Sequence, residues 1–291
     1  MRYILDGYVV DIVILELDHK EAMTMDNEKR LALVTGSSSG IGAAYAKSLA
    51  ARGYDLILVA RRRNRLEELA GALSRSFGIK TNILVADLSD PQDLSRVEQC
   101  AAGEERLTML INNAGLGGIK PFLEIDREYI QKLIAVNVTA LTLITYAALP
   151  GMLRRGSGII INLASGLAFS HMPGVAVYAP TKAYVAHFTR LLHDEYGSRG
   201  IRFQALLPGL TRTELGSGQQ PAGLMESFPA DKISTPERAA EASLAGLELG
   251  ELVCIPGLPE LREFTHADQA LQDILGKVNA AAAKRYHPYM R

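Results

Sequence analysis

The sequence predicts an α/β fold in which a single doubly wound domain surrounds a parallel sheet. Two observations carry this prediction. Short apolar runs recur without polar alternation, which is typical of strands that are buried on both faces. A segment of helical periodicity follows each run, and this succession continues without a linker or a repeat from residue 30 to residue 257.

Seven strands are expected, and most of them end close to a glycine or a polar residue. Their ranges are 30–36, 55–60, 81–88, 107–115, 156–165, 201–209 and 251–257. The intervening helices are expected at 43–53, 65–77, 91–101, 126–149 and 178–197. In the second helix, for example, Leu66, Leu69 and Leu73 fall on one face, so that face is expected to pack on the sheet.

The chain divides into an N-terminal extension (1–29), a central doubly wound domain (30–258) and a helical tail (259–291). The first segment contains an apolar stretch, but Asp11 and Glu16 interrupt it, and no basic lead-in or cleavage site marks a signal peptide. It is either an extra strand or ordering arm, or an over-long start assignment over residues 1–24 with the natural start at Met23 or Met25, which is the preferred interpretation. In the tail, residues 264–286 predict a helix that packs on the body or a partner subunit, or that simply lies on the surface.

Composition excludes several classes of function. The 291 residues carry a formal net charge of −1, which does not favour nucleic acid as a partner. No unbroken apolar run reaches the roughly 18 residues that span a bilayer. Cys100 and Cys254 lie far apart, which suits a reduced, cytoplasmic protein. The six histidines show no metal-ligand spacing, so no catalytic metal is expected.

The segment TGSSSGIG (35–42) lies between the first strand and the first helix, where a phosphate-binding turn is expected. Gly36 would permit the tight turn, Gly40 the approach of a pyrophosphate, and Gly42 close packing of the helix on the strand. A simple tight turn is the alternative. In this context the pattern favours a nucleotide site.

The second strand ends in LVARRR (58–63), and this ending favours NADP(H) as the cofactor. An NAD site usually has an acidic residue here, whereas a guanidinium can bind a 2′-phosphate in a two-pronged contact. Arg61 is the best candidate and Arg62 the next. Asp87, at the end of the third strand, could accept a hydrogen bond from the adenine amino group. The alternative is a solvated basic turn.

Taken together, TGSSSGIG, NNAG (112–115), Asn137, Ser165, YAPTK (178–182) and PG (208–209) resemble the short-chain dehydrogenase/reductase family. The resemblance covers about residues 30–257 and implies a Rossmann sheet of seven strands. It also implies an NADP(H)-linked reaction between a carbonyl and an alcohol, a site at the carboxyl ends of the strands, and a homodimer or homotetramer. The family's catalytic positions fall on Asn137, Ser165, Tyr178 and Lys182.

The chemistry of these four residues suits the reduction of a carbonyl. Tyr178 would donate the proton, and a nearby Lys182 ammonium would lower the pKa of its phenol towards neutrality. Ser165 would hydrogen-bond the substrate oxygen. Asn137 would anchor a water that links Lys182 to solvent. The alternatives are a structural hydrogen bond for Asn137 and a turn role for Ser165.

Further cofactor contacts are expected around the turn and the strand ends. The full predicted set is Gly36, Ser38, Ser39, Gly40, Ile41, Gly42, Arg61, Arg62, Asp87, Leu88, Asn113, Ala114, Gly115, Tyr178, Lys182, Pro208, Gly209 and Thr211. Substrate specificity is expected in 116–120, 166–175 and 210–235, and the Gly- and Pro-rich part of the last segment resembles a mobile lid.

The first hypothesis for function is therefore an NADP(H)-dependent oxidoreductase, a ketoreductase or the reverse alcohol dehydrogenase, with a small carbonyl or alcohol compound as its substrate. The second is a non-catalytic NADP(H)-binding redox sensor. The third, an epimerase or dehydratase of nucleotide sugars, ranks lower because only about 80 residues follow Gly209. Sugars, steroids, fatty acyl chains and xenobiotic carbonyls all remain open as substrates.

Overall fold

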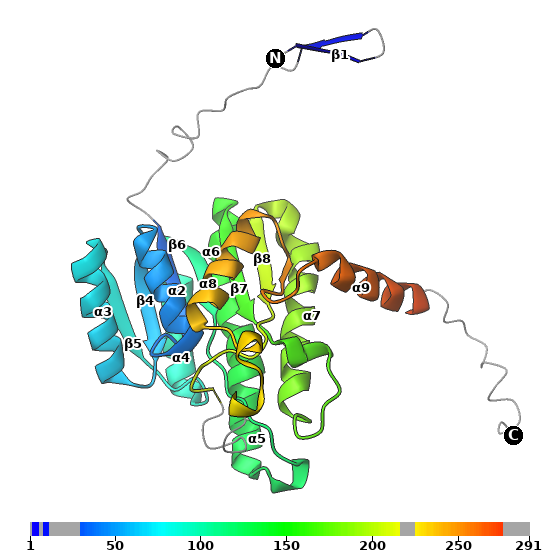
Figure 1. Cartoon of the computed structure of the whole chain (residues 1–291). Coiled ribbons are helices and arrows are strands. Elements are labelled where there is room, and N and C mark those ends of the chain that lie inside the picture. The colour runs from blue at the N-terminus through cyan, green and yellow to red at the C-terminus, as the bar shows by residue number, and fades with distance from the viewer. Residues whose placement is uncertain (1, 6–7, 12–29, 216–224, 276–291) are drawn as a thin grey trace, which may run out of the picture.

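The computed structural model describes residues 2–5, 8–11, 30–215 and 225–275, and it confirms the predicted parallel sheet (Figure 1). The seven strands lie in the order β5-β4-β3-β6-β7-β8-β9, and every neighbouring pair is parallel. Their bounds are β3 Leu31–Thr35, β4 Asp55–Ala60, β5 Thr81–Val85, β6 Leu107–Asn112, β7 Gly158–Leu163, β8 Ile201–Leu206 and β9 Val253–Cys254.

The strand order positions the functional site. From β3 the chain moves outward to β4 and β5, and it then crosses back to place β6 on the other side of β3. The carboxyl ends of β3 and β6 therefore border the point where the winding reverses. Ligands of open α/β sheets bind in the crevice at this point.

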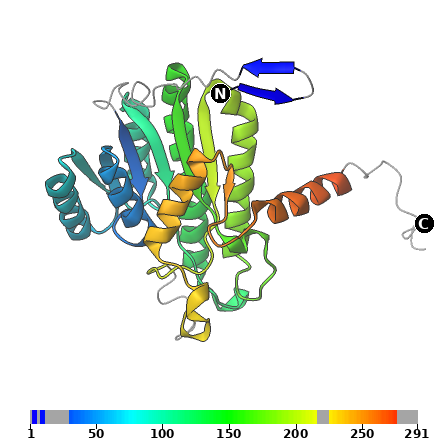
Figure 2. The same cartoon turned by 45° about the horizontal axis from the view of Figure 1, so that its top comes forward.

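Helices cover both faces of the sheet (Figure 2). One layer contains α2, α3 and α8, and the other contains α4, α6 and α7. Their bounds are α2 Gly40–Ala51, α3 Arg63–Phe77, α4 Pro91–Gly103, α6 Leu141–Arg155, α7 Tyr178–Tyr196 and α8 Pro236–Glu248. Pro180 lies in the first turn of α7, where its missing N–H costs no helical hydrogen bond.

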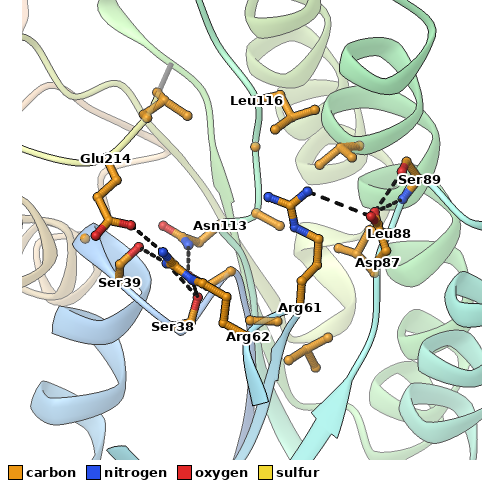
Figure 3. Close-up of a pocket in the computed structure, with 18 of the residues that line it drawn as sticks. Ser38, Ser39, Arg61, Arg62, Asp87, Leu88, Ser89, Asn113, Leu116 and Glu214 are labelled. Carbon is orange, nitrogen blue, oxygen red and sulfur yellow. Dashed lines mark hydrogen bonds and ion pairs between the residues drawn. The ribbon is translucent and has the colours of Figure 1, made fainter. Parts of the chain in front are cut away.

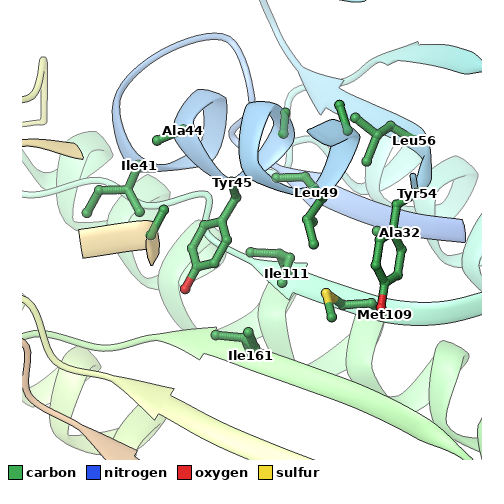
Figure 4. Close-up of a cluster of buried hydrophobic side chains, with 14 of the residues drawn as sticks. Ala32, Ile41, Ala44, Tyr45, Leu49, Tyr54, Leu56, Met109, Ile111 and Ile161 are labelled. Atoms are coloured by element: carbon green, nitrogen blue, oxygen red, sulfur yellow. The ribbon is translucent and has the colours of Figure 1, made fainter. Parts of the chain in front are cut away.

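Alternate residues of each strand enter opposite layers of the core. On β3, Ala32 and Val34 face α2 and α8, whereas Leu31 and Leu33 face the α4 and α6 side. Figure 4 shows the first of these clusters, where Tyr45 and Leu49 of α2 point towards the sheet. This burial on both faces explains why the strand sequences are apolar without alternation.

The expected helix 126–149 differs most from the structure. It is divided into α5 (Arg127–Ile134), the π-helical segment η2 (Ala135–Ala140) and α6, which continues to Arg155. A π-helical turn carries one extra residue per turn, and such turns are frequent at functional sites. Asn137 lies in this segment, so the irregularity falls on a predicted catalytic position.

Several elements are shorter than predicted. The expected strand 251–257 is reduced to β9, which pairs with β8 through two residues. The tail helix α9 spans Leu261–Leu275, and the remainder of the expected range 264–286 lies outside the described residues. In the N-terminal extension, β1 (Arg2–Leu5) and β2 (Tyr8–Asp11) form an antiparallel hairpin that is a separate sheet. The start at Met23 or Met25 stays a prediction.

Within the described residues, one helical stretch, Arg127–Arg155, is long and apolar enough by length and composition to cross a membrane. Half of its most apolar window is buried, since α6 packs against α4 and the strands. Core helices of globular proteins can be equally long and apolar. This stretch was not identified from the sequence alone, because threonines interrupt its run of apolar residues.

Candidate active site

The glycine turn after β3 is held by the end of β6. Asn113 Nδ2 donates to the carbonyl oxygens of Thr35 at 2.8 Å and Gly36 at 3.3 Å. The Thr35 hydroxyl accepts from the backbone N–H groups of Asn113 and Ala114, each at 3.0 Å. Asn113 and Thr35 therefore tie the ends of β3 and β6 together. A side chain at Gly42 would collide with this tie, because its Cβ would lie 2.4 Å from Asn113 Nδ2.

The residues of this turn fit an anionic phosphate. Gly36 and Gly40 adopt φ values of +67° and +57°, which other residues rarely adopt. Helix α2 begins at Gly40 with no acidic residue in its first turn and no side-chain cap from Ser39. Its first N–H groups therefore face the cleft, where they favour negative charge.

A cleft of about 520 Å³ opens at the switch point between β3 and β6. It brings together most of the predicted cofactor residues, shown in part in Figure 3. Those that line it are Gly36, Ser38, Ser39, Gly40, Ile41, Arg61, Arg62, Asp87, Leu88, Asn113, Ala114 and Gly115. A volume of this size is typical of a small-molecule or cofactor site.

On one wall of the cleft, Arg61 reaches towards Asp87 (Figure 3). The closest charged atoms, Arg61 Nη1 and Asp87 Oδ2, are 3.8 Å apart, and the Arg61 side chain is 65% exposed. Ser89 donates to Asp87 Oδ1 through its N–H and its hydroxyl. Burial raises the pKa of Asp87, but these bonds and the nearby cations outweigh it, so its pKa is lowered overall. Arg61 is therefore only loosely held.

Arg62 points in the other direction, over the glycine turn (Figure 3). Its guanidinium donates to the hydroxyls of Ser38 and Ser39 at 2.8–3.2 Å. Its Nη1 also donates to Glu214 Oε2 at 2.6 Å, and Arg65 Nη1 donates to Glu214 Oε1 at 2.7 Å. These two bonds lower the pKa of Glu214 to about 2. The second arginine of the predicted pair is therefore occupied by a carboxylate of the chain.

Behind the other end of the cleft, next to its lining residues Gly115 and Leu163, Tyr178 and Lys182 lie one turn apart at the start of α7. Lys182 is 2% exposed, and its Nζ lies 5.9 Å from the centre of the Tyr178 ring. That Nζ donates to the carbonyl oxygen of Leu163, at the end of β7, at 2.7 Å. Burial lowers the pKa of Lys182 to about 8.

The pKa of Tyr178 departs from the sequence-based expectation. Its phenol was expected to have a lowered pKa, but burial raises the pKa, and the adjacent Ser165 hydroxyl opposes this only in part. The expected direction was wrong for the chain without a ligand, because removal of the phenolate from water is the largest effect.

Asn137 and Ser165 both make structural bonds. Asn137 Oδ1 accepts from the N–H of Leu116, while its Nδ2 donates to the Leu116 carbonyl, each at 2.8 Å. Nδ2 also donates to Thr181 Oγ1 at 3.1 Å. The amide thus fixes the strand end next to Lys182, and the water relay stays a prediction. Ser165 Oγ accepts from Leu167 N–H at 3.2 Å, so Ser165 also caps the 3-10 turn η3 (Gly166–Phe169).

Six predicted cofactor residues do not line the cleft: Tyr178 and Lys182 lie behind its catalytic end, and the other four lie at its margins. Gly42 lies behind the turn, and Pro208 accepts from Gly166 N–H at 3.0 Å beside the Ser165 turn. The Thr211 hydroxyl donates a hydrogen bond to the Gly209 carbonyl. Thr213 takes the place expected for Thr211 and lies against Gly40.

Twelve lining residues were not in the predicted cofactor set: Val59, Ala60, Ala86, Ser89, Leu116, Tyr129, Lys132, Val136, Leu163, Thr213, Glu214 and Leu215. Leu116 and the last three fall in segments that were expected to contact the substrate. Tyr129 and Lys132 lie one turn apart on one face of α5, which is a signal that helical spacing could have revealed. Glu214 follows the proline–glycine turn by five residues, and no motif marks it.

The segments expected to contact the substrate meet beside Tyr178. Lys120 N–H donates to the Gly174 carbonyl at 2.9 Å, so 116–120 and 166–175 are joined. A small hollow of about 10 Å³ lies between them and Tyr178. The exposed aromatic Phe169 packs on Phe264 of α9, with ring centres 5.3 Å apart. The described part of 210–235 contains two short 3-10 turns, η5 (Met225–Ser227) and η6 (Ala230–Lys232).

Comparisons with known proteins agree with this geometry. A sequence model described as short chain dehydrogenase matches residues 30–222. The chain is 35% identical over 231 residues, 77% of its length and 72% of the relative's, to a very-long-chain 3-oxoacyl-CoA reductase of Anas platyrhynchos. Over 188 residues, 64% of the chain and 57% of the relative, it is 34% identical to the "inactive hydroxysteroid dehydrogenase-like protein 1" of Homo sapiens. The chain thus spans between 57% and 72% of the length of these two curated relatives.

Two solved structures are similar over 88% of this chain. A short-chain dehydrogenase from Sphingobium yanoikuyae, in complex with NADPH, matches over its full length with a TM-score of 0.83 and 38% identity. A bulky-bulky ketone specific alcohol dehydrogenase from Comamonas testosteroni matches over 98% of its length with a TM-score of 0.80 and 34% identity.

Proposed function

Because the chain belongs to the short chain dehydrogenase family, we propose that it interconverts a carbonyl compound and an alcohol with NADP(H) as its hydride carrier. One observation carries the proposal: a buried tyrosine–lysine pair lies directly behind Gly115 and Leu163 at one end of the cleft, and two arginines line its other end. The first pair suits proton transfer, and the second suits a phosphate.

The cofactor, when bound, supplies a hydride to the carbonyl carbon. Reduction also requires a proton on the carbonyl oxygen, and the phenol of Tyr178 donates it. The hydroxyl of Ser165 lies beside this phenol and donates a hydrogen bond to the same oxygen, which stabilises its developing charge. In the reverse direction the phenolate accepts the proton of the alcohol.

Lys182 supplies the charge that makes this proton transfer feasible. With a pKa of about 8 it is mostly protonated at neutral pH, and its ammonium is buried near the phenol. A positive charge at this position favours the phenolate and opposes the effect of burial on Tyr178. Asn137 keeps the neighbouring backbone in place through its bonds to Leu116.

We propose a bulky, largely apolar ketone or aldehyde as the substrate. Phe169 and Met172 are exposed on the loop that follows Ser165, and Leu215 is exposed next to Gly117. Leu215 also lines the cleft, and exposed apolar side chains at or near a binding site favour an apolar ligand. The names of two similar proteins, a very-long-chain 3-oxoacyl-CoA reductase and a bulky-bulky ketone specific alcohol dehydrogenase, support the same class.

A non-catalytic NADP(H)-binding protein is the second candidate function. The relative described as inactive supports it, because a similar chain can lack the reaction. The presence of both Tyr178 and Lys182 in a buried arrangement favours the enzyme.

The two candidates are separated by the oxidation of NADPH, followed by absorbance, with a panel of aliphatic and aromatic ketones. Tyr178→Phe should reduce turnover by about 10²- to 10⁴-fold while NADPH binding is retained. Tyr196→Phe is the matched control, since Tyr196 lies at the far end of the same helix and does not line the cleft. NADPH binding without turnover of any ketone in the wild type would favour the non-catalytic candidate.

A homo-oligomer and a cytoplasmic location are further proposals. Tyr146, Tyr184 and Leu191 are exposed apolar side chains on α6 and α7, and this supports an interface between copies of the chain. Light scattering after gel filtration would measure the mass, and a monomer at micromolar concentration would contradict the proposal. Imaging of a fluorescent fusion would test the location.

A further inference from the structure

The segment Thr213–Leu215 lies along the cleft and touches its two ends. A Cβ added to Gly40 would lie 3.2 Å from the Thr213 methyl, so Thr213 covers the phosphate turn. A Cβ added to Gly117 would lie 3.3 Å from Leu215 Cγ and 3.1 Å from the Tyr178 ring. Leu215 therefore lies close to the catalytic end. Glu214 is the charged residue of this segment.

Glu214 engages two arginines at once. Its Oε2 accepts from Arg62 at 2.6 Å, and its Oε1 accepts from Arg65 at 2.7 Å. The Nε and Nη2 of Arg62 donate to the hydroxyls of Ser38 and Ser39. Arg62 thus links the phosphate turn to Glu214, both of which line the cleft (Figure 3).

A carboxylate bridging two guanidinium groups resembles the contact that arginines make with a phosphate. The resemblance is one of charge and geometry, since Glu214 presents one oxygen to each arginine and a phosphate can bridge two guanidinium groups in the same way. Arg61, on the opposite wall, has only the 3.8 Å approach to Asp87. Arg62 and Arg65 are therefore the arginines that an internal anion already occupies.

We propose that Glu214 determines the selectivity of the cleft for the 2′-phosphate of the cofactor, because it occupies Arg62 and Arg65 until that phosphate exchanges for it. The proposal rests on the NADP(H) binding proposed above. On this proposal Glu214 weakens the binding of an adenosine that carries a 2′-phosphate, whereas the arginines strengthen it. It also couples phosphate binding to the release of Thr213–Leu215 from the cleft.

The exchange is energetically feasible. The side chains of Glu214, Arg62 and Arg65 are all between 42% and 49% exposed, and exposed ion pairs contribute little to stability. A 2′-phosphate carries more negative charge than a carboxylate and has three oxygens to offer. Loss of the Glu214 charge removes a competitor for the arginines and also a repulsion of the incoming phosphate. Both effects should make the binding of the phosphate tighter.

The test is calorimetric binding of adenosine 2′,5′-bisphosphate and adenosine 5′-monophosphate to the full chain. Glu214→Gln should bind the bisphosphate about 3- to 10-fold more tightly than the wild type, and the monophosphate with a change below about 2-fold. Glu241→Gln is the matched control. Glu241 is a similarly exposed carboxylate bonded to Arg52 at 2.7 Å, and neither residue lines the cleft.

Weaker or unchanged binding of the bisphosphate by Glu214→Gln would overturn the proposal, since Glu214 would then hold the arginines ready for the phosphate or would have no influence on it. An equal gain for both nucleotides, or the same gain in the Glu241→Gln control, would overturn it as well. A wild type that binds the monophosphate but shows no preference for the bisphosphate would instead contradict the proposed NADP(H) binding. The two failures are therefore distinguishable.

Discussion

The catalytic end and the phosphate end of the cleft hold their cations in opposite ways. At the catalytic end Lys182 is buried, bonds one backbone carbonyl and has its pKa lowered to about 8. At the phosphate end Arg61, Arg62 and Arg65 remain largely in water, and carboxylates of the chain lie beside them. Burial adjusts the acidity of a group, whereas exposure makes its charge available to a ligand.

The replacement Lys182→Met tests the buried end and should have the largest effect. Turnover should fall by about 10²-fold or more, because the phenol of Tyr178 loses the cation that favours its ionised form. The free energy of unfolding should not fall. Removal of the buried charge should raise the free energy of unfolding by about 3 kcal/mol. The Leu163 carbonyl, left without its donor, should lower it by about 1 kcal/mol. Urea unfolding and initial rates measure the two quantities.

The dependence on pH checks the sign of this effect. The pKa of Lys182 in the fold, about 8, is below its ordinary value of 10.5, so the unfolded chain binds more protons between these values. Lys182 therefore lowers stability below pH 8, and this penalty shrinks as the pH rises. The stability difference between Lys182→Met and the wild type should be smaller at about pH 9 than at about pH 7. A constant difference would mean that Lys182 is not desolvated.

The replacement Asn113→Ala tests the tie between β3 and β6. It removes two hydrogen bonds from a buried amide and should lower the free energy of unfolding by about 1–3 kcal/mol. NADPH and NADH should both bind more weakly and by a similar factor, since the turn that holds their common diphosphate loosens. Asn82→Ala, at an exposed position of β5, should change stability by less than about 0.5 kcal/mol. Fluorescence titration and chemical denaturation provide the measurements.

The replacement Arg61→Gln tests the exposed end. NADPH should bind about 10-fold more weakly, while binding of NADH should be nearly unchanged, since only the 2′-phosphate distinguishes the two nucleotides. Arg63→Gln is the control, because Arg63 is also exposed, pairs with Glu67 and does not line the cleft. An equal loss for both nucleotides would assign Arg61 to the adenosine and not to the phosphate.

Ionic strength should have the smallest effect and should separate the two ends most directly. Between about 0.05 M and about 0.5 M salt, binding of NADPH should weaken by about 2- to 4-fold more than binding of NADH. The pH profile of turnover should not move, because the pair of Tyr178 and Lys182 is shielded from mobile ions. A profile that shifts with salt would show that the catalytic end is open to solvent.

Sequence alone predicted those features that depend on a local backbone requirement. The turn at 35–42 and the strand–helix alternation belong to this group, because glycine freedom and apolar burial are properties of short segments. The π-helical turn at Asn137 and the short β9 depend on packing, which periodicity does not encode. The pKa direction of Tyr178 was missed because burial is a property of the whole fold.

At the phosphate end, the sequence likewise did not predict a contact between residues that are far apart along the chain. The role of Arg61 and Arg62 could be inferred from their position after β4, where a ribose contact is expected. The partner of Arg62 could not, since Glu214 lies 152 residues further along the chain and follows no motif. The replacement of Thr211 by Thr213 on the cleft wall depends on how the chain turns after Gly209.

The bond between Thr35 and Asn113 also sets an order of events during synthesis. Its two residues are 78 positions apart, so the glycine turn leaves the ribosome well before its partner has been made. At about 5–20 residues per second the turn waits about 4–16 s for Asn113. A growing chain that stops short of β6 therefore holds an unfinished phosphate turn, and competence to bind a nucleotide arises only after the crossover has returned to the centre of the sheet.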